Sequence, residues 1–179
     1  MQSIVPLATP WWVNLLVVVP VVPYLLSRKA KLRLGRKQLL AAALFGIAFG
    51  FVEAAVVVYL RAATGLWPGP VEKVLVSVPE KLLKIETLRE AATMVMLGSI
   101  AWLMVQSARE RLAAFLWAFA FWDVFYYVWL RLIIGWPASL LTSDVLFLIP
   151  APWVAQVWFP ILISAVTAVV IWFRCAKGR

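Results

Sequence analysis

Residues 43–53 read Ala-Leu-Phe-Gly-Ile-Ala-Phe-Gly-Phe-Val-Glu, and residues 113–123 read Ala-Ala-Phe-Leu-Trp-Ala-Phe-Ala-Phe-Trp-Asp. When the alignment is extended to 23 positions, nine are identical, and each quoted stretch ends in an acid, Glu53 or Asp123. Self-similarity at a fixed spacing indicates a repeated structural unit. The sequence therefore predicts two related units, offset by about 70 residues, each beginning with an apolar helix that carries one carboxylate.

An arginine follows each acid by eight residues, at Arg61 and Arg131, and a Trp-Pro pair follows each helix. A second apolar stretch completes each unit. We therefore divide the chain into an N-terminal helix with a basic loop (residues 1–37), a first repeat (38–106) and a second repeat (107–179). Both repeats run in the same direction, so they are parallel rather than inverted.

The composition is that of an all-α integral membrane protein. Of the 179 residues 65% are hydrophobic and only 14% are charged, whereas a soluble domain has about 45–50% apolar and about 25% charged residues. A transmembrane helix needs about 20 apolar residues. Five stretches are expected to span the membrane: 11–27, 39–60, 86–106, 112–134 and 153–173.

Basic residues are expected to lie mainly on one side of the membrane. With these spans, 11 of the 17 Lys and Arg residues fall on the side that carries the C-terminus. Because positive charge favours the cytoplasmic side, we expect a prokaryotic cytoplasmic (inner) membrane protein with its N-terminus outside. The net charge of +9 is explained by this rule, and no nucleic-acid partner is expected.

The two long outer loops, residues 66–79 and 136–152, are too apolar for ordinary solvated loops and too short to cross. They are expected to be re-entrant or interfacial segments that cap the outer end of the bundle. A capping box formed by Ser77 and Glu80 is expected to begin the third membrane helix.

Ionisable residues at membrane depth are the candidate site, because such residues are costly unless they face the interior of a bundle. A face of small residues (Ala42, Gly46, Gly50 and Ala54) lies beside Glu53 and predicts close helix packing there. On the fourth span a tyrosine hydroxyl is expected to bond to Asp123. The candidate ligand-binding residues are Glu53, Asp123, Arg89, Glu86, Glu90, Arg61, Arg131, Tyr126, Tyr127 and Asp144.

Three functions fit this pattern. The favoured one is binding or transport of a small anionic or lipidic ligand between the repeats, or service as a subunit of a membrane complex, as a homo-oligomer or with partner subunits. The alternative is an intramembrane enzyme that uses carboxylate acid/base chemistry or Mg²⁺ held by Glu86, Glu90 and Asp123. The third is a purely structural subunit, whose aromatic faces pack against partner helices; the charges would then form an ion network that fixes helix register.

Cofactors are constrained by the absence of histidine. A chain without histidine cannot ligate haem or chlorophyll through that residue, and it lacks the usual zinc ligands. No resident metal is expected, and the sequence identifies neither a catalytic residue nor a cofactor.

Overall fold

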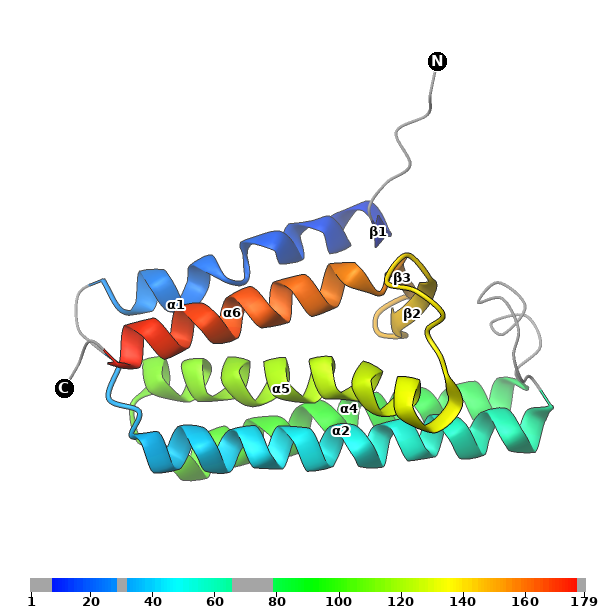
Figure 1. The fold of residues 1–179 in the computed structure, drawn as a ribbon, viewed down its shortest axis with the longest axis horizontal. Helices are drawn as coiled ribbons and strands as arrows, with labels where there is room; N and C mark the ends of the chain where they lie inside the picture. The colour runs from blue at the N-terminus through cyan, green and yellow to red at the C-terminus, as the bar shows by residue number, and fades with distance from the viewer. Residues whose placement is uncertain (1–7, 29–31, 66–78, 177–179) are drawn as a thin grey trace, which may run out of the picture.

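The computed structural model describes residues 8–28, 32–65 and 79–176. Within them the chain forms an elongated helical bundle with a small β-sheet at one end (Figure 1). The helices are η1 (Trp11–Val18, a 3₁₀ helix), α1 (Val21–Leu26), α2 (Arg36–Thr64), α4 (Glu80–Met104), α5 (Ala108–Ile134) and α6 (Trp158–Ala176). The strands are β1 (Ala8–Thr9), β2 (Ser143–Phe147) and β3 (Trp153–Gln156).

Helix α5 is the centre of the bundle and packs against α2, α4 and α6. In Figure 1, η1 and α1 run along α6 on the side away from α2. In this position the aromatic side chains of α5 can pack against three neighbouring helices. Trp117 illustrates the packing, since its indole Nε1 donates a hydrogen bond of 2.8 Å to the Leu39 carbonyl of α2.

Small residues allow α2 and α5 to touch through their backbones, as the sequence predicts. A Cβ atom on Gly46 would lie 2.6 Å from the Ala118 carbonyl oxygen, and one on Gly50 would lie 2.9 Å from the Trp122 carbonyl oxygen. Ala54 continues this face and is fully buried. Glu53, which directly precedes Ala54 in the chain, is therefore held between helices.

Helices α2 and α5, which begin the two predicted units, end in the same way. α2 stops at Gly65 and α5 stops at Gly135, and both glycines have a left-handed backbone with φ of 66° and 70°. Glycine is the residue that adopts this conformation at low cost, so both helix ends are encoded locally. The predicted capping box of α4 involves Ser77, which lies outside the described residues; α4 itself begins at Glu80, after Pro79.

The predicted first span is not one continuous α-helix. Residues 11–27 form η1 and α1, interrupted around Pro20, and together they amount to a short apolar helical stretch. Proline lacks a backbone N–H and its ring collides with the preceding turn, which accounts for the break.

A three-stranded antiparallel sheet covers one end of the bundle in the order β1-β3-β2. The segment 136–152, expected to be re-entrant or interfacial, supplies strand β2 of this sheet. Nearly all of the other expected segment, 66–79, lies outside the described residues. One expectation is corrected, because residues 153–156, predicted to begin the fifth span, form β3, so that α6 begins only at Trp158. The apolar character of β2 and β3 is used in sheet pairing and in packing onto the helices.

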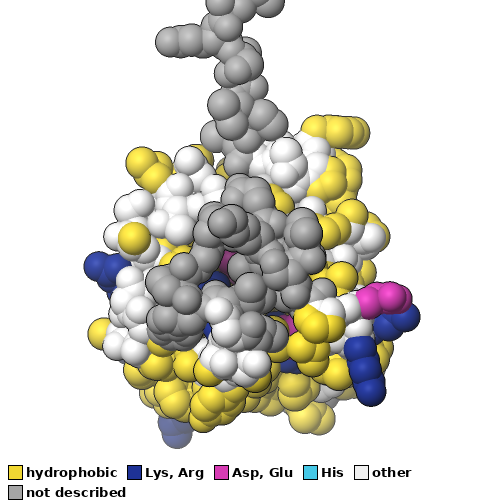
Figure 2. All heavy atoms as spheres, turned by 90° about the vertical axis from the view of Figure 1, so that its right-hand side faces the viewer, with side chains coloured by type: hydrophobic (Ala, Val, Ile, Leu, Met, Phe, Trp, Pro, Cys, Tyr) yellow, Lys and Arg dark blue, Asp and Glu magenta, His cyan; other side chains and the backbone are white. Residues whose placement is uncertain are grey.

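Within the described residues, three helices are long and apolar enough to cross a membrane, namely α2, α5 and α6. Helix α4 is long, but its first half carries several charged residues. Figure 2 shows the sheet end of the molecule, where hydrophobic side chains cover much of the visible flanks and charged side chains stand mainly near the rim. The fold is compatible with a membrane protein built around α5.

Candidate functional site

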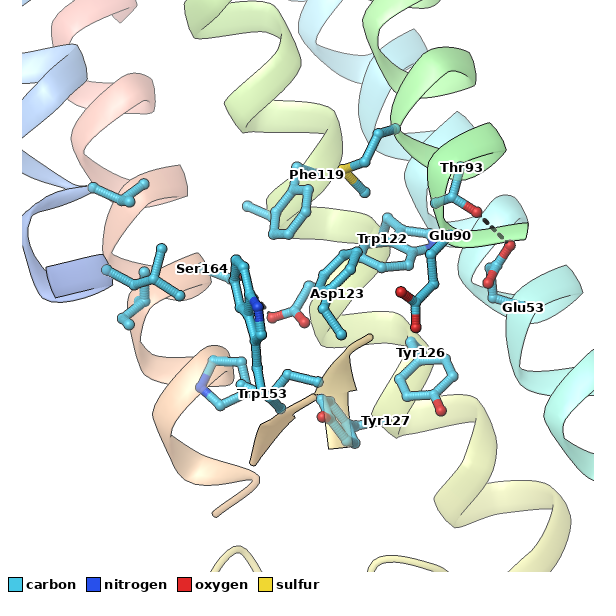
Figure 3. Close-up of a pocket in the computed structure, with 18 of the residues that line it drawn as sticks. Glu53, Glu90, Thr93, Phe119, Trp122, Asp123, Tyr126, Tyr127, Trp153 and Ser164 are labelled. Carbon is cyan, nitrogen blue, oxygen red and sulfur yellow. Dashed lines mark hydrogen bonds between the residues drawn. The ribbon is translucent and has the colours of Figure 1, made fainter. Parts of the chain in front are cut away.

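A cavity of about 430 Å³ lies between the helices and the sheet (Figure 3). Its walls come from α2, α4, α5 and α6, from strands β2 and β3, and from η1. The polar side chains that line it are Glu53, Arg89, Glu90, Thr93, Asp123, Tyr126, Tyr127, Asp144, Ser164 and Thr167. Seven of the ten residues selected from the sequence therefore meet at one cavity.

Glu53 is the centre of a buried ionic cluster between α2 and α4. It is 4% exposed and forms an ion pair with Arg89. Thr93 donates a hydrogen bond of 2.8 Å to its other oxygen. Arg89 is also held by Glu86, with its Nε 2.9 Å from the Glu86 carboxylate. Helix α4 places Glu86, Arg89 and Thr93 on one face at helical spacing. A single stretch of sequence therefore supplies Arg89 and Thr93, which contact Glu53, and also Glu86, which contacts Arg89.

Asp123 is held differently. It is 8% exposed and accepts a hydrogen bond of 2.8 Å from Ser164 of α6. Among the residues that the structure describes, no basic side chain forms an ion pair with it. The prediction that a tyrosine hydroxyl of the same helix bonds to Asp123 is wrong, because Tyr127 donates instead to Asp144, at 3.0 Å.

Two further acids tie the sheet to the helices. Glu90 of α4 accepts a hydrogen bond of 2.8 Å from the backbone N–H of Leu148, just beyond β2. Asp144 lies on β2, is 7% exposed, and receives the Tyr127 hydroxyl. Burial raises the pKa of Asp144 to about 6, although the Tyr127 hydrogen bond and the positive charge of Arg61 act in the opposite direction.

Glu86, Arg61 and Arg131 are not among the described residues that line the cavity. Glu86 contributes to the site indirectly, because its carboxylate binds Arg89. The guanidinium of Arg61 lies over the Trp136 ring, 4.4 Å from its centroid. Arg131 donates hydrogen bonds to the carbonyls that follow α5, including that of Pro137 at 2.8 Å. Both arginines therefore stabilise the end of the bundle around the second Trp-Pro pair.

Aromatic side chains form a continuous wall of the cavity. The ring centroids of Phe119 and Trp122 are 5.2 Å apart, those of Trp122 and Phe147 are 6.3 Å apart, and those of Phe147 and Trp153 are 5.4 Å apart. The indole N–H groups of Trp122 and Trp153 are buried and have no hydrogen-bond partner among the described residues. Since buried donors are nearly always paired, these two indoles are exceptions in the wall of the cavity.

Sequence reasoning missed part of this site. An offset of 70 residues pairs Thr93 with Ile163, so it does not point to Ser164. Thr93 and Ser164 correspond at an offset that is one residue longer. Phe147 and Trp153 reach the cavity through the sheet, which was not predicted.

Metal chemistry finds little support in this arrangement. In the ranges covered by the structure, no group of three or more Asp, Glu, Cys or His side chains is placed to hold a metal ion. Glu86, Glu90 and Asp123, the set considered for Mg²⁺, instead bind Arg89, a backbone N–H and Ser164 respectively. The magnesium form of the enzyme hypothesis therefore lacks its ligand cluster.

Comparisons of this chain with protein-family models, with curated proteins and with solved structures gave no match.

Proposed function

We propose that this chain is a multi-pass membrane protein that binds an amphipathic, lipid-like ligand in the cavity beside α5. The supporting observation is the chemical order of the cavity wall along that helix. Phe115, Leu116 and Phe119 line its first part, and Asp123, Tyr126 and Tyr127 line its last part. At 1.5 Å per residue this wall runs for about 18 Å, from an apolar end to a polar end.

Such an order suits a molecule with an apolar body and one polar group. The body would lie against the aliphatic and aromatic side chains near the middle of the bundle, and the polar group would reach the acids near the sheet. Ligand sites in proteins are commonly apolar cavities with a few placed polar groups that fix orientation. The indole donors of Trp122 and Trp153, which have no hydrogen-bond partner among the described residues, add polar groups to this wall.

The charges of the cavity favour a neutral or cationic polar group over the anionic one that the sequence also allowed. Four acids line the cavity, Glu53, Glu90, Asp123 and Asp144, against one arginine among the described residues. That arginine, Arg89, is already bound to two carboxylates. An anionic headgroup would therefore meet net repulsion.

The membrane setting belongs to the same proposal. The N-termini of α2 and α5 and the C-terminus of α6 lie at the end of the bundle opposite the sheet (Figure 1). These three helix ends carry basic residues, among them Arg36, Arg109 and Arg174. The positive-inside rule would place this end in the cytoplasm of a prokaryotic cell and the sheet end outside.

An intramembrane enzyme is the second candidate. Asp123 favours it, because a buried carboxyl group that faces an aromatic cavity without a basic partner can take the role of a general acid. A bound molecule that is recovered chemically changed would support this alternative; one recovered unchanged would support binding.

Native mass spectrometry of the protein, extracted gently from its own membrane, tests the proposal. A small molecule should be retained by the wild type and lost from Ala120→Phe, because Ala120 is buried and lines the cavity. Ala48→Phe is the matched control, since Ala48 is exposed on α2. Retention of the same molecules by all three proteins, each confirmed as folded by its melting temperature, would reject a ligand site in this cavity.

A further inference from the structure

The two buried acids, Glu53 and Asp123, share one kind of contact and differ in another. Thr93 on α4 and Ser164 on α6 each donate a hydrogen bond of 2.8 Å to the acid of a neighbouring helix, Glu53 or Asp123. They differ in the residue four positions before the one that carries the hydroxyl. This residue is Arg89 in α4 and Pro160 in α6.

Arg89 forms the ion pair that neutralises Glu53. The proline at the corresponding place, Pro160, lines the cavity and carries no charge. In the part of the chain that the structure describes, Asp123 therefore has the hydroxyl donor of its counterpart but not the cation. A buried carboxylate without a counter-charge is expensive, typically by several kcal/mol.

The surroundings of Asp123 are suited to supplying that cation from a ligand. Trp122, Phe147 and Trp153 present a row of aromatic rings along the cavity, with neighbouring centroids 5.4–6.3 Å apart. Aromatic faces attract organic cations, and an ammonium group enclosed by such rings beside a carboxylate is a common mode of recognition. Figure 3 shows Asp123 close to Trp122 and Trp153, with Tyr126 and Tyr127 nearby.

We infer that the ligand is a cationic amphiphile, whose ammonium group pairs with Asp123 in the place that Arg89 takes at Glu53. Its apolar chain extends toward Phe115 and Phe119. This inference rests on the proposed function and specifies the chemical class of the ligand.

Four probes with the same ten-carbon chain test it: decyltrimethylammonium, decylamine, decanol and decanoate. Binding is measured calorimetrically to the full chain in phosphatidylcholine nanodiscs, and the signal of empty nanodiscs is subtracted. We expect both cations to bind at least about tenfold more tightly than decanol, since an ammonium group pairs with the buried carboxylate and a hydroxyl group does not. Decanoate should bind most weakly.

Variants locate the charge. Asp123→Asn should remove the preference for cations, whereas Glu80→Gln, which removes a charge from an 80% exposed side chain, should keep it. Pro160→Arg should abolish cation binding because its guanidinium would occupy the site, while Pro160→Ala should leave binding intact. The proline stands in the first turn of α6, where replacement does not break a helical hydrogen bond.

The outcomes separate the inference from the proposed function. If decanol binds as tightly as the cations, or if Asp123→Asn keeps the preference, the ligand is not recognised by its charge and the inference fails, although a lipid site remains. If none of the four probes binds above empty nanodiscs, both the inference and the amphiphile site are contradicted. Cation binding to Pro160→Arg at wild-type strength would show that the cations bind elsewhere.

Discussion

Thr93 and Ser164 make the same contact on opposite sides of α5: each donates its hydroxyl, at 2.8 Å, to a buried acid of a neighbouring helix. The two acids, Glu53 and Asp123, end the two stretches of sequence that resemble each other. The likeness between the two halves therefore includes a polar contact between helices, and the cavity lies where the two contacts approach each other.

Removing either hydroxyl should weaken the bundle. Thr93→Val and Ser164→Ala should each lower the free energy of unfolding by about 1–3 kcal/mol, because a buried carboxylate loses a donor. Ser99→Ala is the control, since Ser99 is exposed and, among the described residues, donates its hydroxyl to the Val95 carbonyl of its own helix; its effect should stay within about 0.5 kcal/mol. Denaturation in a mild detergent measures all three, and equal melting would contradict a stabilising role for the two contacts.

Arg89 should matter more for stability than Arg61. Its side chain is 22% exposed and joins two carboxylates, so Arg89→Gln leaves buried negative charge behind and should cost about 3–5 kcal/mol. Arg61→Gln should cost clearly less, because that guanidinium stacks on Trp136 near the end of the bundle. Adding Glu53→Gln to Arg89→Gln should recover part of the loss. A double variant no more stable than the single one would argue against the ion pair as the cause.

The close contact of α2 and α5 gives a steric prediction. Gly46→Ala should destabilise the protein by about 1–3 kcal/mol, because the new methyl group would meet the Ala118 backbone oxygen at 2.6 Å and would push the helices apart. Gly98→Ala is the matched change on α4, where nothing lies within 4 Å of the new atom. It should be neutral or stabilising, since alanine favours helix by about 1 kcal/mol. Melting temperatures that fall equally would contradict this packing.

Asp144 predicts a pH dependence. Its pKa is about 6 in the folded protein and 3.8 in the unfolded chain, so folding favours the protonated form. The stabilisation is complete below pH 3.8 and is lost as the pH rises through about 6, and it amounts to about 3 kcal/mol. Asp144→Asn should therefore flatten the fall in melting temperature between pH 4 and pH 7. An unchanged pH profile would show that Asp144 does not titrate in this range.

The sequence anticipated α2, α4, α5 and most of α6 because the signals that were used are local. Apolar runs of sufficient length predict the helices, and small residues at every fourth position predict close packing. The close approach at Gly46 and Gly50 is confirmed. Gly65 and Gly135, whose role was not predicted, end α2 and α5 in the left-handed conformation.

Neither the sheet nor the contact of Asp123 with Ser164 could be predicted from local signals in the sequence. Strand β1 has only two residues, Ala8–Thr9, and pairs with Val154 and Ala155 from the far end of the chain. A pairing so short and so distant leaves no periodic pattern. Ser164 was missed for a different reason. The loop between the two helices differs in length by one residue between the two predicted units, so a fixed offset of 70 residues selects a different face of the second helix.

Photoaffinity labelling tests the central claim most directly, that the cavity beside α5 holds an amphiphile. A ten-carbon amine with a photoreactive diazirine in its chain is irradiated with the protein in nanodiscs, and labelled peptides are mapped by mass spectrometry. The account predicts labels on the cavity wall of α5, around Phe115 and Phe119, that disappear in Ala120→Phe. Labels confined to exposed side chains such as Leu103 and Leu132, unchanged in that variant, would contradict it.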